Sequence, residues 1–260
     1  MLINEKTIKL WSSIGPRATL GLAINELAKN HDDLVVLTCD VSTSAGLDRF
    51  KKAHPDKYYD IGIAEQNLIG IAAGFASENH NVPTTTFAPF QAIRCCEQIK
   101  VNLGYMKHKI CMVGIASGLV LGNLGFTHCC IEDVGILRSI PNLTIVSPAD
   151  SLEVVKVLQS VLKEKKTSVY IRLTGGANNP IVYNSDYKFV LGKAIELTEG
   201  GDVTIFSSGS MVYQSLQASK LLKEKKINAK VINMHTIKPI DQNALKGSLG
   251  SKLLVSVEEH

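Results

Sequence analysis

The sequence lacks any continuous apolar stretch close to the roughly 20 residues that a membrane-spanning helix needs, which excludes a helical membrane protein. It also lacks a strong charge of either sign, because 28 basic and 24 acidic residues leave a formal charge of +4. No basic patch is interleaved with aromatic residues, so nucleic-acid binding is not expected. With 45% apolar and 20% charged residues, the composition is that of a globular protein rather than a disordered chain.

The cysteines lack the spacing of a metal site. Cys95 and Cys96 are adjacent, as are Cys129 and Cys130, whereas zinc-binding pairs are separated by two or more residues. The chain of 260 residues is also far longer than the small secreted scaffolds that depend on disulfides. We therefore expect reduced thiols that line the core of a cytoplasmic protein.

Apolar runs of strand length alternate with segments of helical period. Residues 18–29 carry apolar side chains at i, i+3, i+4 and i+7, and residues 34–37 (LVVL) form a continuous apolar run. Further helix–strand pairs are predicted at 64–76 and 82–87, 91–103 and 109–115, 132–139 and 143–146, and 151–162 and 168–173. This alternation predicts an α/β fold with a mostly parallel sheet and helices on both faces. In such folds, ligands bind at the carboxyl ends of the strands.

A segment rich in Gly, Asn and Pro, at residues 175–187, interrupts this pattern. A second α/β unit of about seventy residues follows, with strands predicted at 203–206, 228–233 and 253–257 and helices at 211–223 and 242–245. We expect a first domain at residues 1–175, a linker at 176–189 and a second domain at 190–260. Because the sequence ends directly after a buried-looking strand, we expect this second domain to be incomplete or to be completed by other chains.

The segment Tyr58-Tyr-Asp-Ile-Gly-Ile-Ala-Glu-Gln-Asn67 contains the first candidate for chemistry. Gly62 and Ala64 are small, so a flat ligand or another backbone can approach closely. Glu65 follows where a helix is expected to begin. Its carboxylate either favours the helix dipole alone or lies at the rim of an apolar surface, where it can share a proton with a heteroaromatic nitrogen.

Aromatic residues and a histidine follow two of the predicted strands. Phe87 and Phe90 lie three residues apart in Thr84-Thr-Thr-Phe-Ala-Pro-Phe90, and they either form a stacking surface for a ring or belong to the core. His128 ends the glycine-spaced segment Leu121-Gly-Asn-Leu-Gly-Phe-Thr-His128. A lone histidine is usually structural, but one in a glycine-rich loop at the strand ends is a candidate for proton transfer or for binding a polar substrate.

Two arginines stand apart from other charges. Arg17 lies at the start of a predicted helix and Arg172 at the end of a predicted strand. Each either binds an anionic substrate group or pairs with a surface carboxylate.

Together these motifs resemble the pyrimidine-binding half of transketolase, a thiamine diphosphate enzyme. The resemblance rests on Asp60-Ile-Gly-Ile-Ala-Glu-Gln66 and is supported by Ser147-Pro-Ala-Asp150, Arg138-Ser-Ile-Pro-Asn142, Thr86-Phe-Ala-Pro-Phe90 and the loop that contains His128. It covers essentially the whole chain. Residues 1 to about 175 resemble the pyrimidine-binding domain, and residues from about 190 to 260 resemble the start of the C-terminal domain.

The resemblance implies a role for each candidate. Glu65 would hydrogen-bond N1′ of the aminopyrimidine ring of the cofactor and, with His128, would be catalytic. The implied cofactor-binding positions are Asp40, Ile63, Glu65, Phe87, Phe90 and Ile93, and the implied substrate-binding positions are Arg17, His128 and Arg172. Ile93 stands where many members of the family have an aromatic residue.

The resemblance also identifies a missing part. The family holds the cofactor's diphosphate and metal through a Gly-Asp-Gly motif on a separate domain, whereas here Gly201-Asp202 is followed by Val203. The chain therefore resembles the C-terminal subunit of a split transketolase, with no metal ligands of its own. A separate N-terminal subunit would hold the diphosphate and Mg²⁺ (or Ca²⁺ or Mn²⁺), and self-association through the pyrimidine-binding domain would give an α2β2 assembly.

Two departures from the family pattern concern the substrate. Leu124 stands where transketolases usually have an aspartate that contacts a sugar hydroxyl, and Ala116 stands where they have another histidine, so a modified sugar is expected. Two alternatives remain. The chain would be a subunit of another thiamine diphosphate enzyme, such as a 2-oxoacid dehydrogenase β subunit or deoxyxylulose-phosphate synthase, or a non-catalytic subunit of the same fold. A donor assay with ketose phosphate and with pyruvate distinguishes the enzymes.

Overall fold

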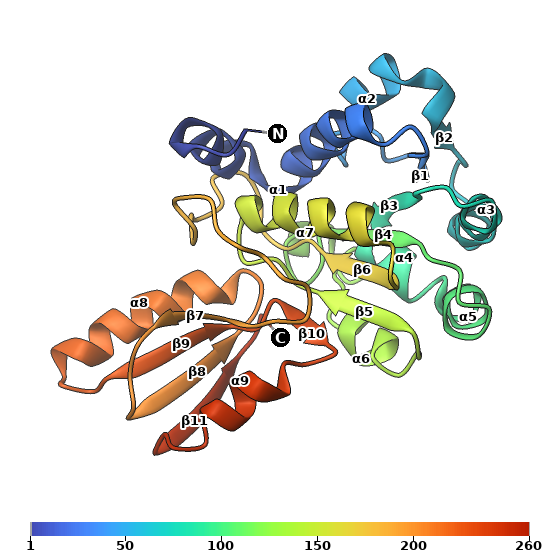
Figure 1. Ribbon diagram of the computed structural model, residues 1–260. Helices are drawn as coiled ribbons and strands as arrows, with labels where there is room; N and C mark the ends of the chain where they lie inside the picture. Colours follow the sequence, from blue (N-terminus) through green and yellow to red (C-terminus); the bar gives the residue numbers. More distant parts are fainter. Residues whose placement is uncertain (1, 260) are drawn as a thin grey trace.

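The computed structural model describes residues 2–259 and arranges them as two α/β units (Figure 1). The larger unit contains a seven-stranded sheet in the order β10-β5-β6-β4-β3-β1-β2. All neighbouring strands are parallel except β10, which is antiparallel to β5. The strands are β1 (Val36–Thr38), β2 (Tyr58–Asp60), β3 (Pro83–Phe87), β4 (Cys111–Ile115), β5 (Leu143–Val146), β6 (Ser168–Arg172) and β10 (Thr236–Lys238). The predicted α/β fold with a mostly parallel sheet is confirmed.

Helices cover both faces of this sheet. One face packs against α1 (Glu5–Leu27), α2 (Asp48–Ala53) and α7 (Ser151–Glu164). The opposite face packs against α3 (Glu65–Ser77), α4 (Ala88–Ala92), α5 (Cys96–Ile99), a π-helix (Lys100–Tyr105) and α6 (Asp133–Leu137). Short 3-10 helices complete the unit at Ala28–Asn30, Pro55–Lys57 and Gly122–Leu124.

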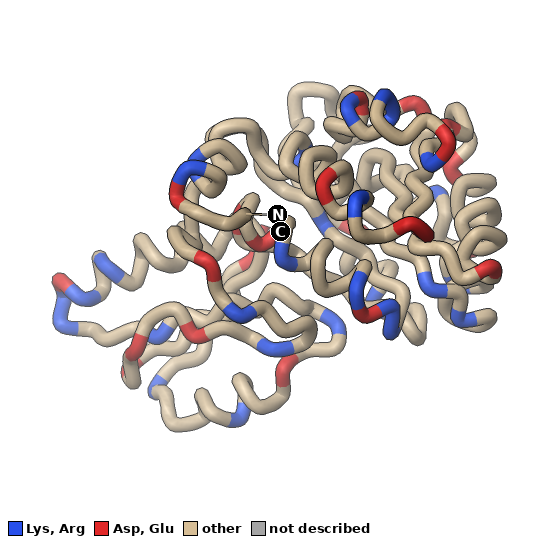
Figure 2. Tube along the Cα trace, turned by 45° about the horizontal axis from the view of Figure 1, so that its top comes forward, with Lys and Arg blue, Asp and Glu red and all other residues tan. Residues whose placement is uncertain are grey.

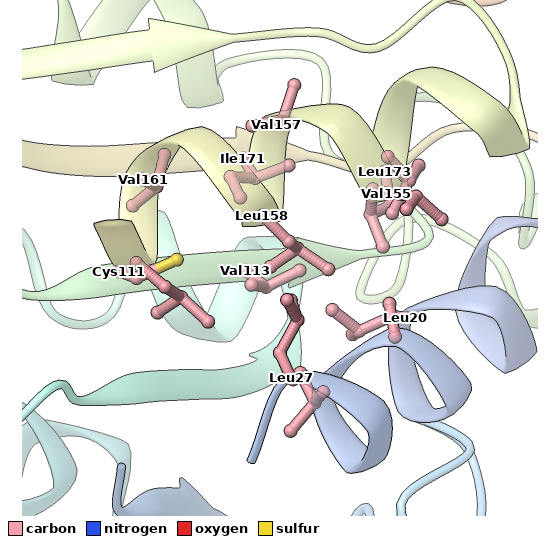
Figure 3. Close-up of a cluster of buried hydrophobic side chains, with 14 of the residues drawn as sticks. Leu20, Leu27, Cys111, Val113, Val155, Val157, Leu158, Val161, Ile171 and Leu173 are labelled. Atoms are coloured by element: carbon pink, nitrogen blue, oxygen red, sulfur yellow. The ribbon is translucent and has the colours of Figure 1, made fainter. Parts of the chain in front are cut away.

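The apolar core lies between the helices and the central strands. Figure 3 shows Leu20 and Leu27 of α1 facing Leu158 of α7 and Val113 of β4, and all four side chains are buried. Every residue of β4 and β6 is buried, as expected for strands that are covered on both faces.

The smaller unit contains a four-stranded sheet in the order β11-β8-β9-β7. β7 is antiparallel to β9 and the other pairs are parallel. Its elements are β7 (Ile195–Thr198), β8 (Val203–Ser207), α8 (Met211–Glu224), β9 (Ala229–Asn233), α9 (Gln242–Gly247) and β11 (Leu253–Val257). Residues 173–194, all of which the structure describes, form no helix or strand. The domain boundaries stay a prediction, because β10 follows β9 in sequence but joins the larger sheet.

Three features differ from the sequence predictions. α1 begins at Glu5 rather than residue 18, because the Asn4 side chain accepts a hydrogen bond from the backbone N–H of Thr7 and starts the helix earlier. The helix predicted at 91–103 is divided into α4, α5 and the π-helix. β2, β7 and β10 were not predicted, because strands of three or four residues are too short to show a clear period.

The cysteines and charges agree with a protein that has neither disulfides nor a highly charged face. All six cysteines are free, and Cys39, Cys95, Cys111 and Cys130 are buried. Figure 2 shows acidic and basic residues interspersed along the chain. Within residues 2–259, no helix has both the length and the apolar character required to cross a membrane.

Candidate functional site

The candidate site lies at the carboxyl ends of β1, β2 and β3, where α3 and α4 begin. β2 ends at Asp60, and Glu65 is the first residue of α3. Leu68 and Ile69, in the first turns of α3, are fully buried against the sheet, and this packing fixes the start of the helix. The Glu65 side chain is consequently 3% exposed although it lies at the edge of the sheet.

The loop between β2 and α3 is tied to the end of β1. The Asp60 carboxylate accepts hydrogen bonds from the backbone N–H of Asp40 at 2.9 Å and of Gly62 at 3.0 Å. Asp40 is exposed and has a positive φ of 54°. Gly62 has a φ of +70°, and an added Cβ would meet no atom within 4 Å, so space is open beside this loop. The structure thus brings Asp40 to the loop that leads to Glu65.

An aromatic cluster forms beside this loop. Phe87 ends β3, Phe90 lies in α4, and their rings are 6.1 Å apart and nearly perpendicular. The His128 ring lies edge-on to both, at 5.7 Å from Phe87 and 5.6 Å from Phe90. Its Nδ1 is 3.0 Å from Thr127 Oγ1. Three candidates that are far apart in the sequence therefore lie in contact.

Arg94 connects the aromatic cluster to Glu65. Its Nη1 donates a hydrogen bond to Glu65 Oε2 at 2.7 Å, and its guanidinium carbon lies 4.2 Å from the centre of the Phe90 ring. The Gln66 side chain donates to the Arg94 carbonyl oxygen at 3.2 Å. Sequence analysis missed Arg94. The available signal was its position four residues after Phe90, where helical side chains are neighbours.

Two thiols lie near the Glu65 carboxylate. Burial raises the pKa of Cys39 to about 11 and that of Cys95 to about 12, and the negative charge of Glu65 raises both further. The Cys95 thiol donates to the Phe90 carbonyl oxygen at 3.1 Å. Since both groups are protonated thiols at neutral pH, they act here as packing groups rather than as nucleophiles.

The two predicted substrate arginines differ in their surroundings. The Arg172 side chain is 5% exposed, and its Nε donates to the Asp133 carboxylate at 2.9 and 3.1 Å. Its partner is therefore a buried carboxylate rather than the surface one that sequence analysis considered. Arg17 is half-buried in α1, and no carboxylate among residues 2–259 forms an ion pair with it.

The other predicted positions surround the cluster. Ile63 and Ile93 are exposed apolar residues that flank Glu65 and Phe90 in sequence. Ala116 is buried directly after β4 with a positive φ of 53°. Leu124 is exposed in the 3-10 helix of the loop that contains His128. The roles of these residues stay predictions.

No group of three His, Cys, Asp or Glu side chains within the described part of the chain is arranged to hold a metal ion. Asp202, in the Gly201-Asp202 pair before β8, accepts hydrogen bonds from Lys252 Nζ at 2.8 Å and from the Asn228 backbone N–H at 2.9 Å. These contacts give Asp202 a structural role at the edge of the smaller sheet.

Comparison with known proteins identifies related sequences along most of the chain. The family model of the transketolase pyrimidine binding domain matches residues 12–179, and that of the transketolase C-terminal domain matches residues 192–260. One of the two subunits of apulose-4-phosphate transketolase from Phocaeicola vulgatus is 39% identical over 237 residues, which are 90% of this chain and 75% of that protein. The 6-deoxy-6-sulfo-D-fructose transketolase subunit SqwH of a Clostridium species is 36% identical over 234 residues, covering 90% and 72%. A solved structure described as a split gene transketolase, inactive beta4 tetramer, has a TM-score of 0.86 at 34% identity, covering 95% of this chain and 81% of that chain.

Proposed function

Since the chain belongs to the transketolase family, we propose that it works as the C-terminal subunit of a thiamine diphosphate-dependent split transketolase. The reaction transfers a two-carbon ketol unit from a ketose, or its phosphate, to an aldose acceptor. The observation that carries this proposal is the buried Glu65 carboxylate beside the Phe87, Phe90 and His128 cluster. When bound, thiamine diphosphate supplies the nucleophilic carbon and the electron sink for carbon–carbon cleavage.

The residues around Glu65 fit an aminopyrimidine ring. A flat group that donates a hydrogen bond already rests between the Phe90 face and the Glu65 carboxylate, because the Arg94 guanidinium makes both contacts. Glu65 would accept a proton from the ring, Phe87 and Phe90 would bind its faces and edges, and Ile63, Ile93 and Asp40 would line the surrounding surface. His128, which is half-exposed next to the two phenylalanines, would contact the substrate.

The diphosphate and its divalent metal belong to a separate N-terminal subunit in this proposal. This chain contributes the acidic residue and the aromatic surface, and the active site lies between the subunits. Two copies of each subunit form an α2β2 assembly through the pyrimidine-binding domains, and the enzyme is active only as this assembly. The reduced cysteines support a cytoplasmic location.

A modified sugar is the proposed substrate class. Leu124 and Ala116 offer no hydrogen-bonding side chain at two positions where sugar hydroxyls are usually contacted in the family. The names of two relatives specify an apulose phosphate and a sulfo-sugar as their substrates. Turnover of xylulose 5-phosphate with ribose 5-phosphate at the rate of a housekeeping transketolase would contradict this assignment.

Replacing Glu65 tests the proposed chemistry. In the enzyme reconstituted with its N-terminal subunit, thiamine diphosphate and Mg²⁺, Glu65→Gln is expected to lower kcat by about 10²–10⁴-fold, because the carboxylate no longer exchanges a proton. Glu97→Gln, an exposed residue of α5, serves as the matched control and leaves kcat unchanged. Full activity of the Glu65→Gln enzyme would overturn the assignment, and turnover of pyruvate but not of ketoses would indicate another thiamine diphosphate reaction.

A further inference from the structure

Arg94 occupies the position next to Glu65 that the proposed function reserves for the cofactor ring. Its guanidinium is planar, carries hydrogen-bond donors and lies 4.2 Å from the centre of the Phe90 ring. At the same time its Nη1 donates to Glu65 Oε2 at 2.7 Å. One planar group therefore makes both contacts, the stacking contact and the hydrogen bond to the carboxylate.

Arg94 and Glu65 differ sharply in exposure. The Glu65 side chain is 3% exposed and is fixed by the start of α3, whereas the Arg94 side chain is 43% exposed. The guanidinium can thus move into solvent while the carboxylate cannot. Because Gln66 Nε2 binds the Arg94 carbonyl oxygen, the backbone of Arg94 remains in place when its side chain moves.

We propose that Arg94 is a positioning residue that pairs with Glu65 before the cofactor binds and is displaced by the aminopyrimidine ring. This inference rests on the proposed function. The exchange keeps the buried carboxylate paired at every stage, first with the guanidinium and then with the ring, and so avoids the high cost of a buried unpaired charge. It also means that cofactor binding competes with an internal cation for the same surface.

The first test measures the pair without any cofactor. In the full chain, Arg94→Ala is expected to lower the melting temperature by about 4 °C or more, because Glu65 is left unpaired. In a Glu65→Gln background, the same substitution should lower it by less than half as much. Equal losses in both backgrounds would show that the two side chains are not coupled and would overturn the inference. Arg94→Gln, which shortens the side chain but keeps a polar end group, replaces Arg94→Ala if that variant does not fold.

The second test measures cofactor affinity by calorimetry in the enzyme assembled with its N-terminal subunit. Arg94→Ala is expected to bind thiamine diphosphate, with Mg²⁺ present, about tenfold more tightly than the wild type, because no internal group must be displaced. Arg94→Lys, which keeps the charge but not the planar group, should lie between them. Arg49→Ala, an exposed arginine on α2, controls for the loss of one positive charge.

The outcomes separate the inference from the proposed function. Unchanged or weaker binding by Arg94→Ala, in an enzyme whose wild type binds the cofactor, would overturn the displacement of Arg94 and leave the proposed function standing. Absence of thiamine diphosphate binding in the wild type and in every variant would overturn the proposed function, and the inference with it.

Discussion

Asp133 is a buried carboxylate whose partners come from a distant strand. It is 0% exposed, accepts a hydrogen bond from the Tyr170 hydroxyl at 2.9 Å, and pairs with Arg172. Sequence analysis identified Arg172 as an isolated cation but could not identify its partner, because 39 residues separate the two in sequence. At this scale, residue type and local spacing predicted Glu65 and the aromatic pair, whereas contacts between distant residues, such as that of Arg94 with Glu65, required the structure.

Asp133→Ala is expected to lower the free energy of unfolding by about 3–5 kcal/mol, because the substitution leaves the Arg172 guanidinium buried without its carboxylate. Chemical denaturation of the full chain measures this loss. Asp32→Ala removes a fully exposed carboxylate that lies 3.9 Å from Lys57, and it should change the free energy of unfolding by less than about 0.5 kcal/mol. Similar small effects in both variants would contradict the structural role of Asp133.

At the scale of elements, the kink in α1 depends on one glycine. Gly15 has a φ of +81°, and Pro16 follows it. The segment after β6 crosses the helix here, so that an added Cβ on Gly15 would lie 2.8 Å from the carbonyl carbon of Gly176. The periodicity of residues 18–29 predicted only the part of α1 beyond this kink, because the kink changes which face of the helix is buried.

Gly15→Ala is expected to cost about 3 kcal/mol or more of the free energy of unfolding, since it combines a left-handed backbone with a steric clash. Gly74→Ala provides a control inside α3, where an added Cβ meets nothing within 4 Å. That substitution should stabilise the chain by about 0.5–1 kcal/mol through the better helix propensity of alanine. Thermal and chemical denaturation of both variants check the opposite signs, and a stable Gly15→Ala variant would contradict the close approach of the backbone segments.

At the scale of the whole molecule, two buried titratable groups near the junction of the sheets have opposite linkage to pH. Burial lowers the pKa of His235 from 6.5 to about 4, so its contribution to stability is lost as the pH falls below 6.5. Burial raises the pKa of Asp150 from 3.8 to about 6, so its contribution is lost as the pH rises through 6. Between pH 7 and 5, acidification removes about 2 kcal/mol through His235 and adds about 1 kcal/mol through Asp150.

His235→Gln is therefore expected to reverse the pH dependence of stability. The wild type should lose a small part of its free energy of unfolding between pH 7 and 5, whereas the variant should gain about 1 kcal/mol because only the Asp150 contribution remains. Guanidinium denaturation at the two pH values measures both changes. If the variant lost stability on acidification as the wild type does, the neutral buried state of His235 would be wrong.

Much of the larger unit could be predicted from the sequence, because strands such as β4 and β6 are covered on both faces and appear as continuous apolar runs. β10 could not be predicted. It contains only Thr236–Lys238, and its position depends on antiparallel pairing with β5, at a distance of about 90 residues along the chain.

The crossing of β10 has a consequence for any attempt to separate the two units. In the intact chain, β10 covers the outer edge of β5, and the backbone N–H of Ser147 donates to the His235 carbonyl oxygen at 2.8 Å. A fragment cut after residue 175 would leave the β5 edge without its partner strand, and unpaired edges recruit other chains into sheet-to-sheet aggregates. The smaller unit thus shields the larger one from aggregation, so we expect a truncated fragment to precipitate where the intact polypeptide does not.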